Sequence, residues 1–328
     1  MTGREEHEAL YKSLSERALV GYPKLFYNFY REASGKQETS RHNWLLKALR
    51  MYDWMMENTG IDLTKNDKWS EVTRREVKDY LLSLKDRNLS YPTMISTYNA
   101  MKKFFHYLEK EEIISKTPVP ELEDIDSIIS SEDNEEKEVV YMTPEEVKKV
   151  CDSIEATSKE PKRDVCLFKL GCRTGLRATA LTEIDVDDID FQKRVLYVIE
   201  KGKKYRKIIL DTDTIRLLIE CIEERDERIA EWGEGAELKA LFIKKHGGVK
   251  RISKKHIANL IEKNTTMLDK HITPHKMRST CITNTYNLTG DIYASARKAG
   301  HKSLSNTKRY INTDNKDCQV AEELANLY

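Results

Sequence analysis

Residues 194–210 read RVLYVIEKGKKYRKIIL, and the hydrophobic pattern of the chain changes within this stretch. Residues 194–199 and 207–210 are short runs rich in β-branched and large apolar side chains, which is typical of strands. The polar segment between them, residues 200–206, contains Gly202 and suits a turn. This stretch therefore predicts a hairpin or a small antiparallel sheet.

The sequence on both sides of this hairpin has helical periodicity. Thr143, Pro144 and Glu146 stand in the order of an N-cap, a first helical position and a capping-box acid. A second helix is expected through residues 164–171, and helical spacing resumes from Thr214 until a turn at residues 246–248. The fold class expected is mainly α, with a small antiparallel β-sheet in a C-terminal domain.

The N-terminal third is predicted to be entirely helical. Four apolar side chains share one helical face, a capping box begins another helix, and an apolar stripe marks a third helix over residues 92–109. The residues concerned are Leu45, Ala48, Leu49 and Tyr52, then Thr73 with Glu76, then Tyr98, Met101, Phe105 and Leu108. Residues 1–35 are expected to add one more helix. Three of the four tryptophans lie in this region, where core packing is their expected role.

An acidic segment separates the two halves. From Glu121 to Glu138 there are nine acidic residues and one basic residue, so the segment carries −8 and the rest of the chain +9. Two prolines precede it, and its composition is too polar to form a core. We therefore predict a helical domain over residues 1–117, an acidic linker over 118–140 and a second domain over 141–328. A basic body permits a phosphate-rich partner, although scattered solvated lysines explain the charge equally well.

Composition narrows the class of protein. Of 328 residues, 39% are hydrophobic and 34% charged, which is polar but sufficient for two cores. There is no apolar run long enough to cross a membrane, and the N-terminus does not resemble a signal peptide. The six cysteines form no CxxC pair and no Cys/His metal spacing, so we expect reduced thiols and cytoplasmic localisation. No metal or cofactor is expected, and the carboxylates of Asp185–Asp190 are interpreted as structural.

Six polar residues occupy positions next to turns or on one face of a helix. Taken singly, each has an ordinary structural explanation, because arginines near turns usually form surface ion pairs and turn lysines are usually solvated. Their order along the chain is what carries information. The six are Arg177, Lys201, His275, Arg278, His301 and Tyr310.

Together these segments resemble the tyrosine site-specific recombinases, which include phage integrases and Xer-type resolvases. The matching segments are CRTGLRATALTEIDVDDID around Arg177, IEKGKKYRKIIL around Lys201, HKMRST with His275 and Arg278, and GHKSLSNTKRYIN with His301 and Tyr310. The run TMISTYNAMKKFFHYLEKE resembles the last helix of that family's core-binding domain, so the likeness covers roughly residues 40–315. It implies a two-domain DNA clamp, in which a helical core-binding domain is joined to a catalytic domain.

The resemblance also implies roles for the six residues. Tyr310 would be the nucleophile that forms a covalent 3′-phosphotyrosine, and Lys201 would protonate the leaving deoxyribose oxygen. Elementary chemistry agrees, because arginine forks match phosphoryl oxygens and a tyrosine hydroxyl needs a proton acceptor near neutral pH. Arg177 and Arg278 would form the phosphate clamp, and His275 is the best candidate for the general base. His301 would donate a hydrogen bond to the phosphate.

The chain departs from the family pattern at one position that bears on the site. Ala180 stands three residues after Arg177, where the family often carries an acidic residue. Another group, with Glu183 the candidate, is therefore expected to orient Arg177. This departure concerns the rate or the pairing geometry and leaves the class of chemistry unchanged.

The implied partners are a double-stranded DNA recombination site and, in the synaptic complex, three further copies of the chain. The free protein is expected to be a monomer or weak oligomer, and an accessory directionality factor is possible. A short apolar face over residues 317–327 would pack in cis or on a neighbouring subunit, with the neighbour favoured.

The main reading is integration or excision of a mobile element. Few residues precede the first helical pattern, so the separate N-terminal arm-binding domain that many integrases carry has little room, which suggests a simple recombinase that acts on core-type sites with fewer accessory factors. Alternatives are an Xer-type dimer resolvase or DNA invertase, a type IB topoisomerase-like enzyme and a non-catalytic DNA-binding protein. Prokaryotic, archaeal and viral host cells all fit the sequence.

Overall fold

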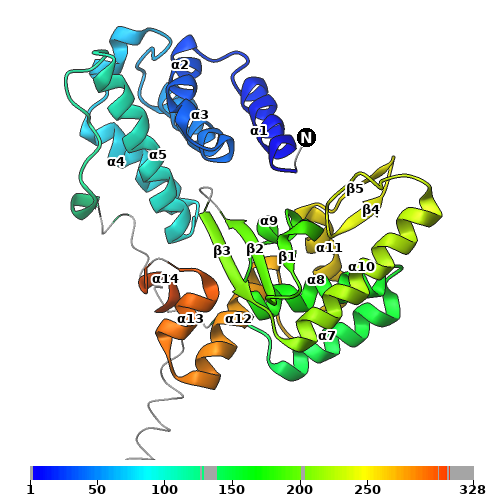
Figure 1. The fold of residues 1–328 in the computed structure, drawn as a ribbon. Helices are drawn as coiled ribbons and strands as arrows, with labels where there is room; N and C mark the ends of the chain where they lie inside the picture. Colours follow the sequence, from blue (N-terminus) through cyan, green and yellow to red (C-terminus); the bar gives the residue numbers. More distant parts are fainter. Residues whose placement is uncertain are drawn as a thin grey trace, which may run out of the picture. The chain divides into compact units, whose positions relative to one another are not determined.

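The computed structural model describes residues 3–125, 128, 139–200, 204–301, 303–308 and 310. The chain divides into two compact units, Met1–Glu136 and Lys137–Tyr328 (Figure 1). Both units are mainly helical, and the strands of the described residues all lie in the second unit. The predicted fold class is therefore confirmed. The predicted linker falls mostly outside the described residues, so the domain limits stay a prediction.

The N-terminal unit is built around α3, which packs against four other helices. The capping box predicted at its fourth helix is present, since the Thr73 backbone N–H donates to Glu76 Oε2 at 2.8 Å. Residues 3–32 form two α-helices where the sequence suggested one helix over residues 1–35. The helices are α1 (Gly3–Ala18), α2 (Lys24–Glu32), α3 (Glu38–Asn58), α4 (Arg74–Asp86) and α5 (Tyr91–Lys110), with 3₁₀ turns at Ala33–Gly35, Asn66–Glu71 and Leu122–Ile125.

Aromatic side chains fill the core of this unit. Trp69 is fully buried, and its ring meets Phe26 and Phe104 edge to face at centroid distances of 6.2 and 5.1 Å. Such contacts add to the hydrophobic gain of burying three large rings. Trp44 and Trp54 are only partly buried against the same core, so their predicted core role holds in part.

The predicted hairpin is present in the second unit as β2 (Val195–Glu200) and β3 (Lys204–Ile209). These strands pair antiparallel, with Tyr197 opposite Lys207, and β1 (Ile189–Asp190) joins the other edge of β2. A second hairpin, β4 (Ile243–Lys245) with β5 (Val249–Arg251), was not predicted. Strands of three residues are too short for an alternating pattern to reveal them.

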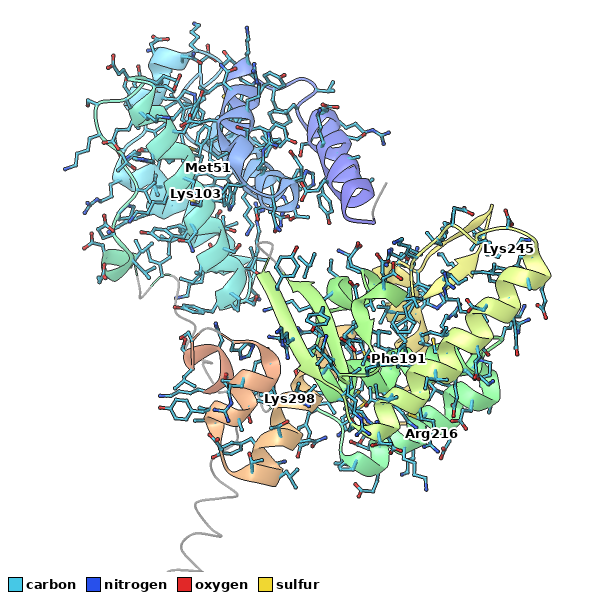
Figure 2. All side chains as sticks on the ribbon, viewed as in Figure 1. Met51, Lys103, Phe191, Arg216, Lys245 and Lys298 are labelled. Atoms are coloured by element: carbon cyan, nitrogen blue, oxygen red, sulfur yellow. The ribbon has the colours of Figure 1, made fainter. Side chains whose placement is uncertain are left out.

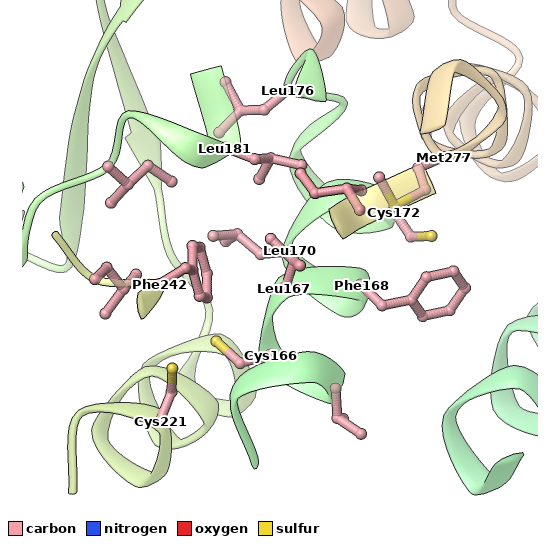
Figure 3. Packing of buried hydrophobic residues seen from close by; sticks show 14 of the residues in the cluster. Cys166, Leu167, Phe168, Leu170, Cys172, Leu176, Leu181, Cys221, Phe242 and Met277 are labelled. Carbon is pink, nitrogen blue, oxygen red and sulfur yellow. The ribbon is translucent and has the colours of Figure 1, made fainter. Parts of the chain in front are cut away.

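Helix α8 lies at the centre of the second unit and packs against α7, α10 and α12. Figure 3 shows Leu167, Phe168 and Leu170 of α8 in this core, with Met277 of α12 close by. The helices are α7 (Pro144–Thr157), α8 (Pro161–Thr174), α9 (Ala178–Thr182), α10 (Thr212–Trp232), α11 (Lys254–Asn264), α12 (Pro274–Thr289), α13 (Ile292–Ala299) and α14 (Ser305–Lys308).

A glycine permits the close crossing of α8 and α12. A Cβ on Gly171 would stand 2.8 Å from Met277 Sδ, so no larger residue fits without a shift of Met277. This contact sets the depth at which α12 enters the core. Met277 is followed directly by Arg278, so the crossing also fixes that arginine.

The cysteines of the described residues behave as the sequence suggested. Five of them are free and buried, and Cys166 and Cys221 face each other between α8 and α10 in Figure 3. Burial raises the pKa of the Cys151 thiol to about 11, so it stays neutral at physiological pH. Buried neutral thiols of this kind are unreactive packing groups.

Candidate active site

The turn between α8 and α9 places Arg177. Gly175 ends α8 with φ of 63°, a left-handed conformation that favours glycine, and Arg177 then occupies the N-cap position of α9. The Arg177 side chain is exposed, whereas Leu176 beside it is buried. The local sequence thus anchors the turn in the core and presents the guanidinium outward.

Helix α12 places His275 and Arg278 on one face, three residues apart. Pro274 at the first helical position starts the helix, as its fixed φ favours. Arg278 is 1% exposed, and its Nη1 donates to the carbonyl oxygen of Gly175. This bond joins α12 to the turn that carries Arg177, so the two predicted arginines are held by one local framework.

Tyr310 contacts His275, the exposed histidine in the first turn of α12. Its hydroxyl is 2.9 Å from His275 Nε2, and its ring stacks on that of His301 at a centroid distance of 5.9 Å. Backbone and side-chain bonds hold it, because Thr283 Oγ1 donates to the Tyr310 carbonyl at 2.9 Å and Tyr310 N–H donates to the Thr307 carbonyl at the same distance. The tyrosine is 5% exposed.

His301 is oriented by a second contact. Its Nδ1 is 2.8 Å from Thr307 Oγ1, in the short helix α14. That contact engages one of the two ring nitrogens and helps to set the orientation of the ring. Its backbone N–H donates to the Ala296 carbonyl at 2.9 Å, at the end of α13.

An open pocket of about 470 Å³ lies beside these groups. It is lined by five basic side chains and three small apolar residues, and none of the lining residues is acidic. A group of basic side chains in one hollow concentrates positive potential there and favours an anionic ligand. The lining residues are Arg177, Ala178, Lys254, Lys255, Ala258, Pro274, His275 and Arg278.

The β2–β3 hairpin is tied to this region by Arg206 of β3. Its Nη2 donates to the Thr174 carbonyl at 3.1 Å and also to the Lys298 carbonyl, and its Nη1 lies 3.4 Å from the Ala299 carbonyl. These carbonyls end α8 and α13, where helix dipoles place partial negative charge. Arg206 therefore connects the turn before Arg177 with the turn before His301.

Five of the six predicted residues lie in this part of the structure. Arg177, His275 and Arg278 line one pocket, and His275 and His301 each contact Tyr310. Lys201 lies outside the described residues, as does the predicted C-terminal helix at 317–327. Their predicted roles therefore remain predictions.

The structure also describes Ala180, which stands where the family often carries an acidic residue. Ala180 is buried on α9, and Glu183 is the C-cap residue of that helix. Nearby, burial raises the pKa of the Cys281 thiol, which keeps it uncharged next to Arg278. The assignment of Glu183 as the group that orients Arg177 remains a prediction.

The carboxylates of Asp185–Asp190 have protein partners. Arg251 pairs with Asp185 at 2.5 Å, Lys239 with Asp187 at 2.6 Å and Lys193 with Asp190 at 2.9 Å. In the described part of the chain, no group of three or more His, Cys, Asp or Glu residues is arranged to hold a metal ion. The acids fasten the start of the sheet to its neighbours, which is a structural role.

Sequence reasoning missed several residues at the site. Lys254 and Lys255 line the pocket, Arg206 connects its two turns, and Thr283 holds the Tyr310 backbone. Two adjacent lysines directly after the N-cap Ser253 were the available signal, because the first turn of a helix ordinarily favours acids. The Arg206 and Thr283 contacts join segments about 30 to 90 residues apart, which no local pattern reveals.

The chain was compared with known proteins. Residues 140–317 match the family described as Phage integrase family. The tyrosine recombinase XerC of Caldanaerobacter subterraneus subsp. tengcongensis is 32% identical over 243 residues, which is 72% of this chain and 63% of that relative. XerC of Actinobacillus pleuropneumoniae serotype 7 is 23% identical over 313 residues, or 92% of each chain.

Solved structures of similar fold include complexes with DNA. The XerH site-specific recombinase bound to palindromic difH substrate has a TM-score of 0.70 and 20% identity, over 90% of this chain and 82% of that one. The Tn1549 transposon integrase in complex with circular intermediate DNA has a TM-score of 0.65 and 22% identity, over 92% and 98%. At these identities the likeness concerns the fold.

Proposed function

The chain belongs to the phage integrase family of tyrosine recombinases, and we propose that it recombines DNA at specific sites through a covalent 3′-phosphotyrosine on Tyr310. One observation carries this proposal. The Tyr310 hydroxyl is 2.9 Å from a histidine nitrogen, beside a pocket lined by cations. A hydroxyl hydrogen-bonded to a base that itself lines a phosphate-attracting pocket is suited to nucleophilic attack on phosphorus.

The proposed reaction exchanges one phosphodiester for another. Tyr310 Oη attacks the scissile phosphorus, the bond between phosphorus and the 5′ oxygen breaks, and the hydroxyl proton passes to His275 Nε2. This step uses the neutral histidine tautomer with its proton on Nδ1, in which Nε2 accepts the tyrosine hydrogen bond. The released 5′ oxygen takes a proton from Lys201. Because the phosphotyrosine conserves the bond energy, rejoining needs no ATP.

The arginines neutralise charge as it develops on the phosphoryl oxygens. Arg278 is buried and Arg177 is exposed, and both line the pocket, so a phosphate bound there could contact both guanidinium groups. Cations fixed in advance stabilise such a transition state without having to reorganise. His301, which stacks on Tyr310, would donate a hydrogen bond to the same phosphate.

We assign residues 1–117 to duplex binding through the faces of α3 and α5. Lys103 Nζ lies 4.6 Å from the centre of the Trp44 ring, and Lys103 is labelled on α5 in Figure 2. Lys47 donates to Ser96, and burial together with the charge of Arg50 lowers the pKa of Lys47. Such a cluster of cations on neighbouring helices gains free energy when it releases counterions from DNA.

The biological role we favour is integration or excision of a mobile element by a tetramer on two DNA sites, in the cytoplasm of the host cell. Proteins of similar fold include both a transposon integrase and the XerH recombinase, so the fold is compatible with this role without selecting it. The sequence similarity to XerC supports the alternative, a dimer resolvase. None of the helices in the described part of the chain combines the length and apolar character needed to cross a bilayer.

The test of the proposed chemistry is covalent trapping on a nicked duplex in EDTA. A bound site would be selected from DNA flanking the gene or from a random duplex pool, then nicked so that cleavage releases a short strand and cannot reverse. The proposal predicts an SDS-resistant adduct with the wild-type protein and none with Tyr310→Phe. Tight binding without any adduct on several nicked sites would favour a non-catalytic DNA-binding protein.

The role is tested by recombination between plasmids. Two sites on separate plasmids and two direct repeats on one plasmid would each be incubated with this protein alone. The mobile-element role predicts joining of separate plasmids as well as excision. Recombination restricted to direct repeats, or dependent on a second recombinase, would support the resolvase alternative. Relaxation of supercoils without any pairing of sites would indicate a topoisomerase-like enzyme.

A further inference from the structure

Helix α11 begins with charges that its own stability does not explain. The N-cap Ser253 is followed by Lys254 and Lys255, and the first turn contains no acid. The backbone N–H groups at a helix start carry partial positive charge, so cations there are unfavourable and acids favourable. Helix α7 of the same unit follows the usual preference, with Glu145 and Glu146 in its first turn.

Both lysines line the basic pocket beside Tyr310. Ala258, one turn further along α11, lines the pocket too, and its small side chain leaves room for a ligand there. Lys254 is half-buried and Lys255 is exposed. Within the described residues, Lys255 takes part in no hydrogen bond or ion pair. A lysine without an acidic partner, in a pocket without acids, is available to a ligand anion.

Contacts with the core hold the rest of α11 in place, so the backbone positions of Lys254 and Lys255 are fixed. Ser253 Oγ accepts from the His256 N–H, and His256 Nε2 lies 3.1 Å from Nη2 of the buried Arg163. Ile257 and Ile261, further along the helix, are each 1% exposed and anchor it in the core. The helix therefore keeps its first turn at the pocket even though that turn is electrostatically unfavourable.

We infer that Lys254 and Lys255 bind the DNA phosphate next to the scissile one, on the strand that Tyr310 attacks. This inference rests on the proposed function, and it assigns to α11 a second phosphate position distinct from the Arg177–Arg278 clamp. An anion at this position relieves the repulsion between the two lysines and gains from the helix N-terminus as well. The contact fixes the strand in register with the nucleophile, so the lysines are positioning residues.

The experiment measures how binding depends on salt. Equilibrium binding to a duplex site would be measured from low to moderate salt in a Tyr310→Phe background, so that cleavage does not intervene. Neutralising one phosphate contact lowers the slope of log K against log salt by about 0.9 for duplex DNA. We expect that loss for the double variant Lys254→Gln with Lys255→Gln. Lys263→Gln, on the last turn of the same helix and outside the pocket, is the matched control and keeps the wild-type slope.

A modified duplex locates the phosphate. With a neutral methylphosphonate next to the scissile phosphate, the single Tyr310→Phe protein should lose the same slope, and the double lysine variant should lose nothing further. The inference is overturned if the lysine variant keeps the full slope, if Lys263→Gln loses as much, or if the variant loses slope again on the modified duplex. The thermal midpoint of the variant should equal or exceed that of the parent, whereas a purely structural role would lower it.

Failure of the proposed function is distinguishable from failure of this inference. Absence of a covalent adduct with the wild-type protein would remove the recombinase chemistry and leave the salt slopes to decide the phosphate contact. An adduct together with unchanged slopes would retain the chemistry and reject the α11 position.

Discussion

Arg206→Met is expected to damage both the stability of the second unit and the rate of DNA cleavage. The substitution keeps an unbranched apolar stem of similar reach and removes the guanidinium that bonds three carbonyls. Arg206 donates to the Thr174 carbonyl at 3.1 Å and also to the Lys298 carbonyl, while the third bond, to Ala299, is long at 3.4 Å. The prediction therefore concerns mainly the ends of α8 and α13.

The expected loss of stability follows from the bonds of Arg206 to the Thr174 and Lys298 carbonyls. A hydrogen bond from a charged donor contributes about 1.5–3 kcal/mol, and partial exposure of Arg206 reduces this value. We expect a loss of about 2–4 kcal/mol from the free energy of unfolding, against a total of about 5–15 kcal/mol for a typical domain. For a domain of this size, that loss corresponds to a fall in thermal midpoint of about 4–16 °C.

The catalytic effect arises because both turns at the site become less fixed. A displacement of about 1 Å at a reacting group costs about 100-fold in rate, so single-turnover cleavage well below the midpoint should slow by about 10–100-fold. The assay would follow adduct formation on the nicked duplex, with hydrogen exchange measured at the Gly300 and His301 amides. Arg206→Lys, which can reach one carbonyl at a time, should fall between the wild type and Arg206→Met.

Arg216→Met is the matched control, because Arg216 is exposed on α10 and pairs only with Asp213 of its own helix, at 3.2 Å, among the described residues. It should change the midpoint by no more than a degree or two and leave cleavage unchanged. The reasoning is refuted if Arg206→Met, folded at the assay temperature, cleaves at the wild-type rate. It is equally refuted if exchange at Gly300 and His301 does not accelerate.

Three further substitutions test other contacts. His275→Gln should slow adduct formation by about 100- to 10,000-fold with unchanged duplex binding; a wild-type rate would reject His275 as the base. Gly175→Ala should cost about 1–2 kcal/mol in denaturant unfolding, because φ is 63° and the new Cβ stands 3.3 Å from Cys281 Sγ; unchanged stability would show that the turn relaxes. Asp164→Asn should cost about 1.5–3 kcal/mol by removing one of the two carboxylates that pair with buried Arg163, the other being Glu160. Burial raises the pKa of Asp164, but bonds from His256, Ser158 and Arg163 outweigh it and lower the pKa below its usual value. Its contribution is therefore present above the unfolded pKa and lost as the pH falls through the folded one, so the wild-type advantage over Asp164→Asn should shrink in acid and a pH-independent difference would contradict this assignment.

Much of the fold could be predicted because local patterns agreed with the tertiary contacts. The capping boxes at Thr73 and Thr143 start helices as predicted, and the β-like runs around Gly202 form the β2–β3 hairpin. The hairpin at residues 243–251 escaped prediction, since its strands are too short to show alternation. The split of residues 1–35 into two helices escaped as well, because the break at residues 19–23 has no proline until Pro23.

The residues of the candidate site also fall into those that a local sequence pattern predicts and those that only the tertiary fold reveals. Residues in motifs with fixed spacing, such as His275 and Arg278, could be found from the sequence, although their contact with Tyr310 required the fold. Arg206 and Lys255 could not be identified, because their roles depend on carbonyls and pocket walls contributed by distant segments. Burial of Arg278 to 1% exposure was also unpredictable, since it depends on the crossing of α8 and α12.

The most direct test of the account maps the covalent adduct. Wild-type protein would be trapped on a nicked duplex, digested with protease and nuclease, and analysed by mass spectrometry, while the freed strand would be tested for phosphorylation by a polynucleotide kinase. We predict a nucleotide attached to Tyr310 and a free 5′ hydroxyl on the released strand, as expected for a 3′-phosphotyrosine. Attachment to another residue, or linkage to the 5′ end, would contradict the assignment of Tyr310 and of the reaction.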